Sequence, residues 1–194
     1  ERGNGSPATY IECFEWFLAP TDDQGLNPKP ELAPHVINNS WYCSESEGCN
    51  PSNFMFMETA IKNLKDAGIV VVVSAGNFGS SNCGTIFSPP AIFEDALVVG
   101  SIRDSGYISG FSSIGPVLID SSNRIKPNVT APGSEVLSQL KDGSYAAWSG
   151  TSMAGPHVAG LVALIVSANP ALAGKVDQIK DIIEASAIKT NAHL

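Results

Sequence analysis

Two segments near the start of the chain carry apolar residues three or four positions apart, the spacing of one face of an α-helix. The apolar residues are Tyr10, Phe14, Phe17 and Leu18 in the first segment, and Phe54, Met57, Ile61 and Leu64 in the second. Pro7 follows Ser6, a residue that can cap a helix, and Pro20 ends the first pattern. Gly68 stands where the second helix would end. The polar, proline-rich residues 20–34 predict a surface loop.

Two short segments, residues 69–73 and 96–99, are continuously apolar. A run of β-branched residues without polar alternation is typical of a strand covered on both faces, as in a parallel sheet between helices. Weaker patterns predict further strands at residues 36–41, 128–130 and 136–140.

The last third of the chain predicts a long helix after Gly150 and a final amphipathic helix. Their apolar faces consist of Val158, Leu161, Val162 and Ile165, and of Val176, Ile179, Ile182 and Ile183. Helices and strands alternate along the chain without an internal repeat or a linker. The pattern therefore predicts one α/β unit with a mostly parallel sheet.

Composition narrows the functional classes. With 194 residues and a hydrophobic fraction of 43%, the chain can form one sizeable core. The net charge of −8 repels phosphate and anionic membrane surfaces alike, so nucleic acid is not expected as a partner. The longest largely apolar stretch, residues 158–166, is about half of the roughly 20 residues needed to cross a bilayer, so no membrane span is predicted.

The four cysteines divide into a close pair and two others. Cys43 and Cys49 lie six positions apart in a Ser/Glu/Gly-rich loop without a nearby histidine, which favours a small disulfide loop over a zinc site. Cys13 falls in a helical pattern and is predicted to be a buried thiol. Cys83, beside Gly84, is either free or paired with one of the loop cysteines.

Small residues surround Ser152 at the predicted start of the long helix. A hydroxyl there lies near free backbone N–H groups that can stabilise developing negative charge, so Ser152 is a candidate nucleophile. The alternative is that Thr151 or Ser152 only caps the helix.

Asn77 follows the apolar strand at residues 69–73, through Ser74, Ala75 and Gly76. The carboxyl ends of strands in α/β sheets are where sites form, and an Asn amide there could donate a hydrogen bond to an oxyanion. The alternative is an Asn that tolerates left-handed backbone in a turn.

Taken together, these stretches resemble the subtilisin-like serine proteases. Residues 150–160 resemble the nucleophile signature of that family, residues 74–77 its oxyanion-hole segment, and residues 36–40 its substrate-pairing strand. Residues 111–116, 126–127 and 131–133 match its connecting motifs in order. The resemblance covers nearly the whole chain and implies a three-layer α/β fold. The insertion at residues 20–34 suggests the bacillopeptidase-like branch.

The resemblance implies peptide-bond hydrolysis through an acyl-enzyme on Ser152, with Asn77 in the oxyanion hole. It places protein or peptide substrates between two rails, Ser40-Trp41-Tyr42 and Ser74-Ala75-Gly76. Phe78 would lie beside the pocket for the residue that precedes the cut. We therefore expect an apolar or aromatic preference there.

The chain departs from the family pattern in its acid–base partners. A serine nucleophile needs a base oriented by a carboxylate. None of the three histidines, His35, His157 and His193, stands where the family has its base, and the Asp and His segments of the family are not found. We expect residues 1–194 to be the C-terminal portion of one catalytic domain whose N-terminal strands lie upstream, and to be inactive alone.

Several further expectations follow from this interpretation. Subtilisins often bind structural calcium through the loop that corresponds to residues 91–96, mainly by backbone carbonyls. The sheet edge left by the missing strands could be covered by self-association. The acidic balance and the expected disulfide agree with a secreted protein. The rival interpretation is a catalytically dead module that binds peptides without cutting them.

Overall fold

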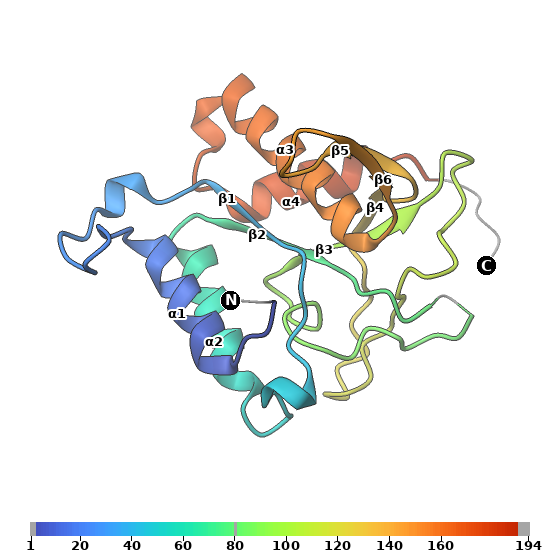
Figure 1. Cartoon of the computed structure of the whole chain (residues 1–194), viewed down its shortest axis with the longest axis horizontal. Coiled ribbons are helices and arrows are strands. Elements are labelled where there is room, and N and C mark those ends of the chain that lie inside the picture. Colours follow the sequence, from blue (N-terminus) through green and yellow to red (C-terminus); the bar gives the residue numbers. More distant parts are fainter. Residues whose placement is uncertain (1–2, 80, 190–194) are drawn as a thin grey trace.

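The fold is seen in a computed structural model that describes residues 3–79 and 81–189, in which a parallel sheet lies between two layers of helices (Figure 1). The strands are β1 (Val36–Asn39), β2 (Val70–Ser74), β3 (Leu97–Ile102) and β4 (Val129–Pro132). They lie side by side in the order β1-β2-β3-β4, and every pair is parallel. The predicted three-layer α/β fold is confirmed.

The helices cover the sheet in pairs. Helices α1 (Pro7–Leu18) and α2 (Phe54–Asp66) lie on one face, and α3 (Thr151–Ala168) and α4 (Val176–Ser186) lie on the other (Figure 1). Strand β2 explains the unbroken apolar run. Val71 and Val73 belong to the core beneath α1 and α2, whereas Val70 and Val72 belong to the core beneath α3 and α4. Because both faces are buried, no polar alternation remains.

Local signals place the helix ends where the sequence predicts them. Ser6 caps α1, since its hydroxyl accepts a hydrogen bond from the Thr9 backbone N–H and the Thr9 hydroxyl accepts one from the Ser6 N–H. After α2, Gly68 has a φ of +89° and lies against Gly174, where a Cβ on Gly68 would come within 2.7 Å of the Gly174 Cα. Only glycine suits both conditions.

A two-stranded antiparallel hairpin, β5 (Val136–Gln139) and β6 (Tyr145–Trp148), follows the sheet. Strand β5 agrees with the predicted strand at residues 136–140, but β6 was not predicted. The reason is that β6 is short and largely exposed, so it carries no buried alternation. Three short 3₁₀ helices, η1 (Pro30–Leu32), η2 (Glu45–Glu47) and η3 (Pro170–Leu172), complete the described elements.

The structure corrects three burial predictions and confirms the disulfide. Cys13 is exposed, because α1 turns the neighbouring Phe14 toward the core instead. Leu161 and Ile182 are each 41% exposed, because each precedes by one position a residue that faces the sheet, a rotation of about 100° around the helix. Cys43 and Cys49 form the predicted disulfide, and Cys83 is free.

Helix α3 has 18 residues and a mean hydropathy of 1.4, which is long and apolar enough, by length and composition, to cross a membrane. This helix is twice as long as the apolar stretch at residues 158–166, so the length of that stretch does not predict this property. In the structure α3 packs against all four strands of the sheet, so one of its faces is covered, while Leu161 and Leu164 on it remain exposed.

Candidate active site

A cleft of about 630 Å³ lies where β1, β2 and α3 meet. Strands β1 and β2 are parallel neighbours, so the segments that follow them leave the same edge of the sheet. All predicted site residues line this cleft, namely Ser40, Trp41, Tyr42, Ser74, Ala75, Gly76, Asn77, Phe78 and Ser152. The fold thus brings together segments that are more than 100 residues apart in the sequence.

Ser152 is the second residue of α3. Its backbone carbonyl accepts a hydrogen bond of 3.0 Å from the Ser40 hydroxyl, which in turn accepts one of 2.9 Å from the Asn38 amide. The N-cap of α3 is Gly150, which has no side chain, and neither Thr151 nor Ser152 is the N-cap residue. The capping alternative is therefore wrong. The contact from Ser40 fixes the start of α3 against the segment after β1.

The Asn77 side chain is oriented by its neighbour in space, Thr151. The Asn77 Oδ1 accepts hydrogen bonds from the Thr151 backbone N–H at 2.9 Å and from the Thr151 hydroxyl at 3.0 Å. Because the oxygen of the amide is fully engaged, its Nδ2 donor is turned the other way. The backbone conformation also excludes the turn alternative, since Gly76, with a φ of +103°, takes the left-handed position and Asn77 does not.

Gly150 keeps space open beside two N–H donors. A Cβ on Gly150 would lie 3.5 Å from Asn77 Nδ2 and 3.7 Å from the Ser152 backbone nitrogen. Both donors therefore border the same small volume next to Ser152. Two converging N–H groups at a helix N-terminus are the arrangement that stabilises an oxyanion.

Ser113 holds residues 76–78 through two hydrogen bonds. Its backbone N–H donates to the Gly76 carbonyl at 2.9 Å, and its hydroxyl accepts from the Phe78 N–H at 3.0 Å. Ser113 is completely buried, so these bonds are shielded from water. In the sequence, Ser113 is recognisable only as part of the connecting motif at residues 111–116. No local pattern indicates that it lies against residues 76–78.

An aromatic cluster forms one wall of the cleft. The Phe78 ring lies 4.5 Å from the Phe87 ring and 5.2 Å from the Tyr42 ring, measured between centroids. Phe78 and Phe87 remain 43% and 39% exposed, so the rings present apolar surface to the cleft. Phe87 was missed in the sequence because it stands in a proline-rich segment without periodicity.

Trp41 also lines the cleft, where Tyr10 stacks against it and Glu47 in turn holds Tyr10. The Tyr10 and Trp41 rings stack at 4.0 Å with an angle of 5°, and the Tyr10 hydroxyl donates to Glu47 Oε1 at 2.7 Å. Burial and the bond to Glu47 raise the pKa of Tyr10 to about 12. Burial opposes ionisation of Glu47, but hydrogen bonds from Ser44, Gly5 and Tyr10 outweigh it and lower its pKa to about 2.

Neither histidine of the described residues lines the cleft. His157 Nδ1 lies 2.8 Å from the Met153 carbonyl on an exposed side of α3, and His35 is exposed ahead of β1. His193 lies outside the described residues. Glu47 does line the cleft, but with a pKa of about 2 it is a poor proton acceptor. The described lining thus provides the Ser152 hydroxyl and two neighbouring N–H donors without a base.

Comparison with known proteins identifies the family. The family model of the subtilases (peptidase S8) matches residues 3–194. The chain belongs to the subtilase family. It is 36% identical to bacillopeptidase F of Bacillus subtilis (strain 168), over 94% of this chain and 12% of that relative. It is 37% identical to subtilisin amylosacchariticus of Bacillus subtilis subsp. amylosacchariticus, over 95% of this chain and 41% of that relative.

Solved structures agree with the fold of this subtilase. A protease of Pseudoalteromonas arctica PAMC 21717 is 27% identical, with a TM-score of 0.70 over 92% of this chain and 51% of that chain. The prenylagaramide maturation protease PagA, at 22% identity, has the same fold, with a TM-score of 0.71 over 96% and 59% of the two chains. The chain therefore spans half or less of the sequence relatives above and a little more than half of these structures.

Proposed function

We propose that this segment carries the nucleophile and the oxyanion hole of a serine endopeptidase. Membership of the subtilase family supports peptidase chemistry on protein or peptide substrates. The observation that carries the proposal is the pair of hydrogen bonds from Thr151 to Asn77 Oδ1. These bonds orient the amide so that Asn77 Nδ2 can donate a hydrogen bond into the cleft beside Ser152.

In the proposed reaction, the Ser152 hydroxyl attacks the carbonyl carbon of the scissile peptide bond. The hydroxyl proton passes to a base, and the carbonyl oxygen becomes an anion that accepts hydrogen bonds from Asn77 Nδ2 and the Ser152 N–H. The base then returns the proton to the leaving amine as the C–N bond breaks. Water hydrolyses the resulting ester and releases the acid with Ser152 regenerated.

The substrate would bind as an added strand between Ser40-Trp41-Tyr42 and Ser74-Ala75-Gly76. The residue that precedes the cut would contact the aromatic cluster of Tyr42, Phe78 and Phe87, for which a large apolar side chain is the best partner. A peptide-library profile dominated by acidic or basic residues at that position would contradict this preference.

The base and its carboxylate are proposed to come from a part of the catalytic domain outside these residues. Two features support this: β1 is an edge strand of the described sheet, and apolar side chains on β5, β6 and α3 remain exposed. The largest of these are Leu137, Tyr145, Trp148 and Leu164. Covering this surface requires further strands and helices, or self-association of the segment.

The rival function is peptide binding without cleavage. The observation that favours it is that the described residues lining the cleft include no base. The two functions separate in one assay. The natural protein that includes the region upstream of this segment should hydrolyse an unfolded protein substrate, and Ser152→Ala should abolish hydrolysis while it retains peptide binding. Equal hydrolysis by both proteins would refute the role of Ser152, and binding without hydrolysis by either would establish the rival.

We also propose an extracellular location. The support is the Cys43–Cys49 disulfide, which persists in oxidising compartments, together with the acidic balance of 19 Asp and Glu against 11 Lys and Arg.

A further inference from the structure

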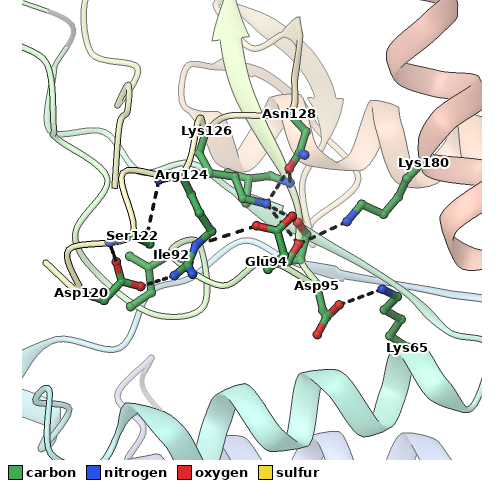
Figure 2. A network of polar contacts seen from close by, with 12 residues as sticks. Lys65, Ile92, Glu94, Asp95, Asp120, Ser122, Arg124, Lys126, Asn128 and Lys180 are labelled. Atoms are coloured by element: carbon green, nitrogen blue, oxygen red, sulfur yellow. Dashed lines mark hydrogen bonds and ion pairs between the residues drawn. The ribbon is translucent and has the colours of Figure 1, made fainter. Parts of the chain in front are cut away.

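The loop ahead of β3 directs its backbone carbonyls at a buried lysine. Figure 2 shows the Lys126 ammonium surrounded by oxygen atoms. Its Nζ lies 2.8 Å from the Ala96 carbonyl, 3.4 Å from the Glu94 carbonyl and 3.0 Å from Asn128 Oδ1. The Lys126 side chain comes from the segment before β4. It therefore links this segment to the loop before β3.

Asn128 is fixed so that its oxygen faces Lys126. Its Oδ1 also accepts the Val98 backbone N–H at 2.8 Å, and its Nδ2 donates to Glu184 of α4 at 2.8 Å. The amide cannot turn over without losing these bonds. The Asn128 oxygen that faces the Lys126 ammonium is thus held in place by β3 and α4.

Two more cations bind the same loop. Arg124 Nε donates to the Ile92 carbonyl at 3.0 Å, and Lys180 Nζ of α4 donates to the Glu94 carbonyl at 3.2 Å (Figure 2). Among residues 92–96, alternate carbonyls, those of Ile92, Glu94 and Ala96, therefore all face a cationic side chain. The positive charges that face this cluster of oxygen atoms are therefore side chains of the protein itself.

The acidic side chains of the loop are engaged as well. Asp95 Oδ1 lies 2.9 Å from Lys65 Nζ, and Glu94 Oε2 lies 4.0 Å from Arg124 Nε. In the part of the chain that the structure describes, no group of three or more His, Cys, Asp or Glu side chains could hold a metal ion. Asp95 is thus committed to Lys65, whereas the Glu94 side chain is largely exposed and is held only by the long contact with Arg124.

Calcium does not fit this arrangement. Ca²⁺ takes about six to eight oxygen ligands at about 2.3–2.6 Å. The Glu94 and Ala96 carbonyls already accept hydrogen bonds from Lys126, and a divalent ion bound to them would lie directly beside its ammonium. The repulsion between the two cations would be strong, because Lys126 is only 4% exposed and poorly screened.

We propose that the Lys126 ammonium is the resident cation of residues 92–96 and that this loop binds no calcium. The proposal departs from the expectation of a structural calcium at residues 91–96, and it stands whether or not the segment belongs to an active peptidase. Burial, followed by repulsion from Lys180, lowers the pKa of Lys126 to about 8, so the side chain remains mainly an ammonium at neutral pH.

A calcium titration of the ¹⁵N-labelled 194-residue chain tests the metal half of the proposal. After treatment with EDTA, the backbone amide signals of residues 92–96 should show no saturable shift up to about 10 mM CaCl₂, a concentration that would fill even weak extracellular sites. A saturable shift of these amides would overturn the proposal. Shifts confined to other residues support it, because they place any calcium elsewhere.

Direct observation of the lysine ammonium groups tests the other half. At pH 6.5 the Lys126 NH₃⁺ signal should be visible and exchange with water at least about tenfold more slowly than that of Lys180, because it is buried and hydrogen-bonded. The signal should vanish in Lys126→Arg and persist in the matched variant Lys180→Arg. A neutral Lys126 amine at pH 6.5, or exchange as fast as that of Lys180, would overturn the assignment. Both tests can be made on the unmodified chain, so a variant that fails to fold does not remove them.

Discussion

Glu47 connects three segments at the edge of the cleft through a single carboxylate. Its Oε1 accepts hydrogen bonds from the Gly5 N–H at 3.0 Å and the Tyr10 hydroxyl at 2.7 Å, and its Oε2 accepts from the Ser44 N–H at 2.9 Å and the Ser44 hydroxyl at 3.0 Å. Replacement by Gln keeps the shape but removes the charge. Glu47→Gln should therefore destabilise the chain at neutral pH.

The pKa of Glu47 sets the size of this effect. A fall from the ordinary value of 4.5 to about 2, at about 1.4 kcal/mol for each pKa unit, corresponds to an upper limit of about 3 kcal/mol. Because Glu47 is partly exposed, screening by water reduces the expected value to about 1–2 kcal/mol. A carboxyl whose pKa is lower in the folded state stabilises the fold above its unfolded pKa, and this contribution is lost as the pH falls through 4.5 toward 2.

Urea unfolding, followed by tryptophan fluorescence, measures the difference in unfolding free energy between the parent and Glu47→Gln. The difference should be about 1–2 kcal/mol at pH 7 and about half of that at pH 3. Glu45→Gln, an exposed change in the same η2 helix, is the control and should have little effect at either pH. A difference between parent and Glu47→Gln that stays constant or grows toward pH 3 would refute the reasoning.

Three other predictions concern the framework of the site. Thr151→Val removes the hydroxyl that bonds Asn77 and should lower the unfolding free energy by about 1–3 kcal/mol, whereas Thr151→Ser should stay close to the parent; similar losses for both would argue against the bond. Replacing Cys43 and Cys49 by Ala opens a six-residue loop and should cost about 2 kcal/mol in the same assay, and an unchanged midpoint would contradict this. Lys65→Met breaks the 2.9 Å ion pairs from α2 to the β3 loop and α4, so it should cost about 1 kcal/mol, with a smaller cost in about 1 M salt; an effect independent of salt would point to packing instead.

Most of the sheet and helices could be predicted because the positions that are buried in the fold determine the spacing of apolar residues in the sequence. Strand β2 has both faces covered and reads as an unbroken apolar run, and α2 buries Met57, Ile61 and Leu64 along one stripe. Strand β6 escaped prediction because its side chains are largely exposed and its pairing with β5 depends on a turn between them. Cys13 was misplaced because helical periodicity alone does not say which side of α1 faces the core.

Residues of the site could be predicted only where the pattern that indicates them lies within one short segment of the sequence. Ser152 and Asn77 are each marked by the small residues around them, and the structure places both on one cleft. The groups that position them were not visible, since Thr151 bonds Asn77 across 74 residues and Ser113 contacts Phe78 across 35. The cations at residues 92–96 were missed for a related reason, because the direction of a backbone carbonyl has no counterpart in side-chain composition.

The central claim, that Ser152 is the nucleophile and depends on a base from outside these residues, is tested most directly by a fluorophosphonate probe, which labels an activated serine. Two proteins are compared, a longer protein in which the proposed upstream part of the catalytic domain precedes this chain, and the 194-residue chain alone, each digested and mapped by mass spectrometry. We predict stoichiometric labelling of Ser152 in the longer protein and none in the chain alone. Rapid labelling of the chain alone, or labelling of a different residue in the longer protein, would contradict the account.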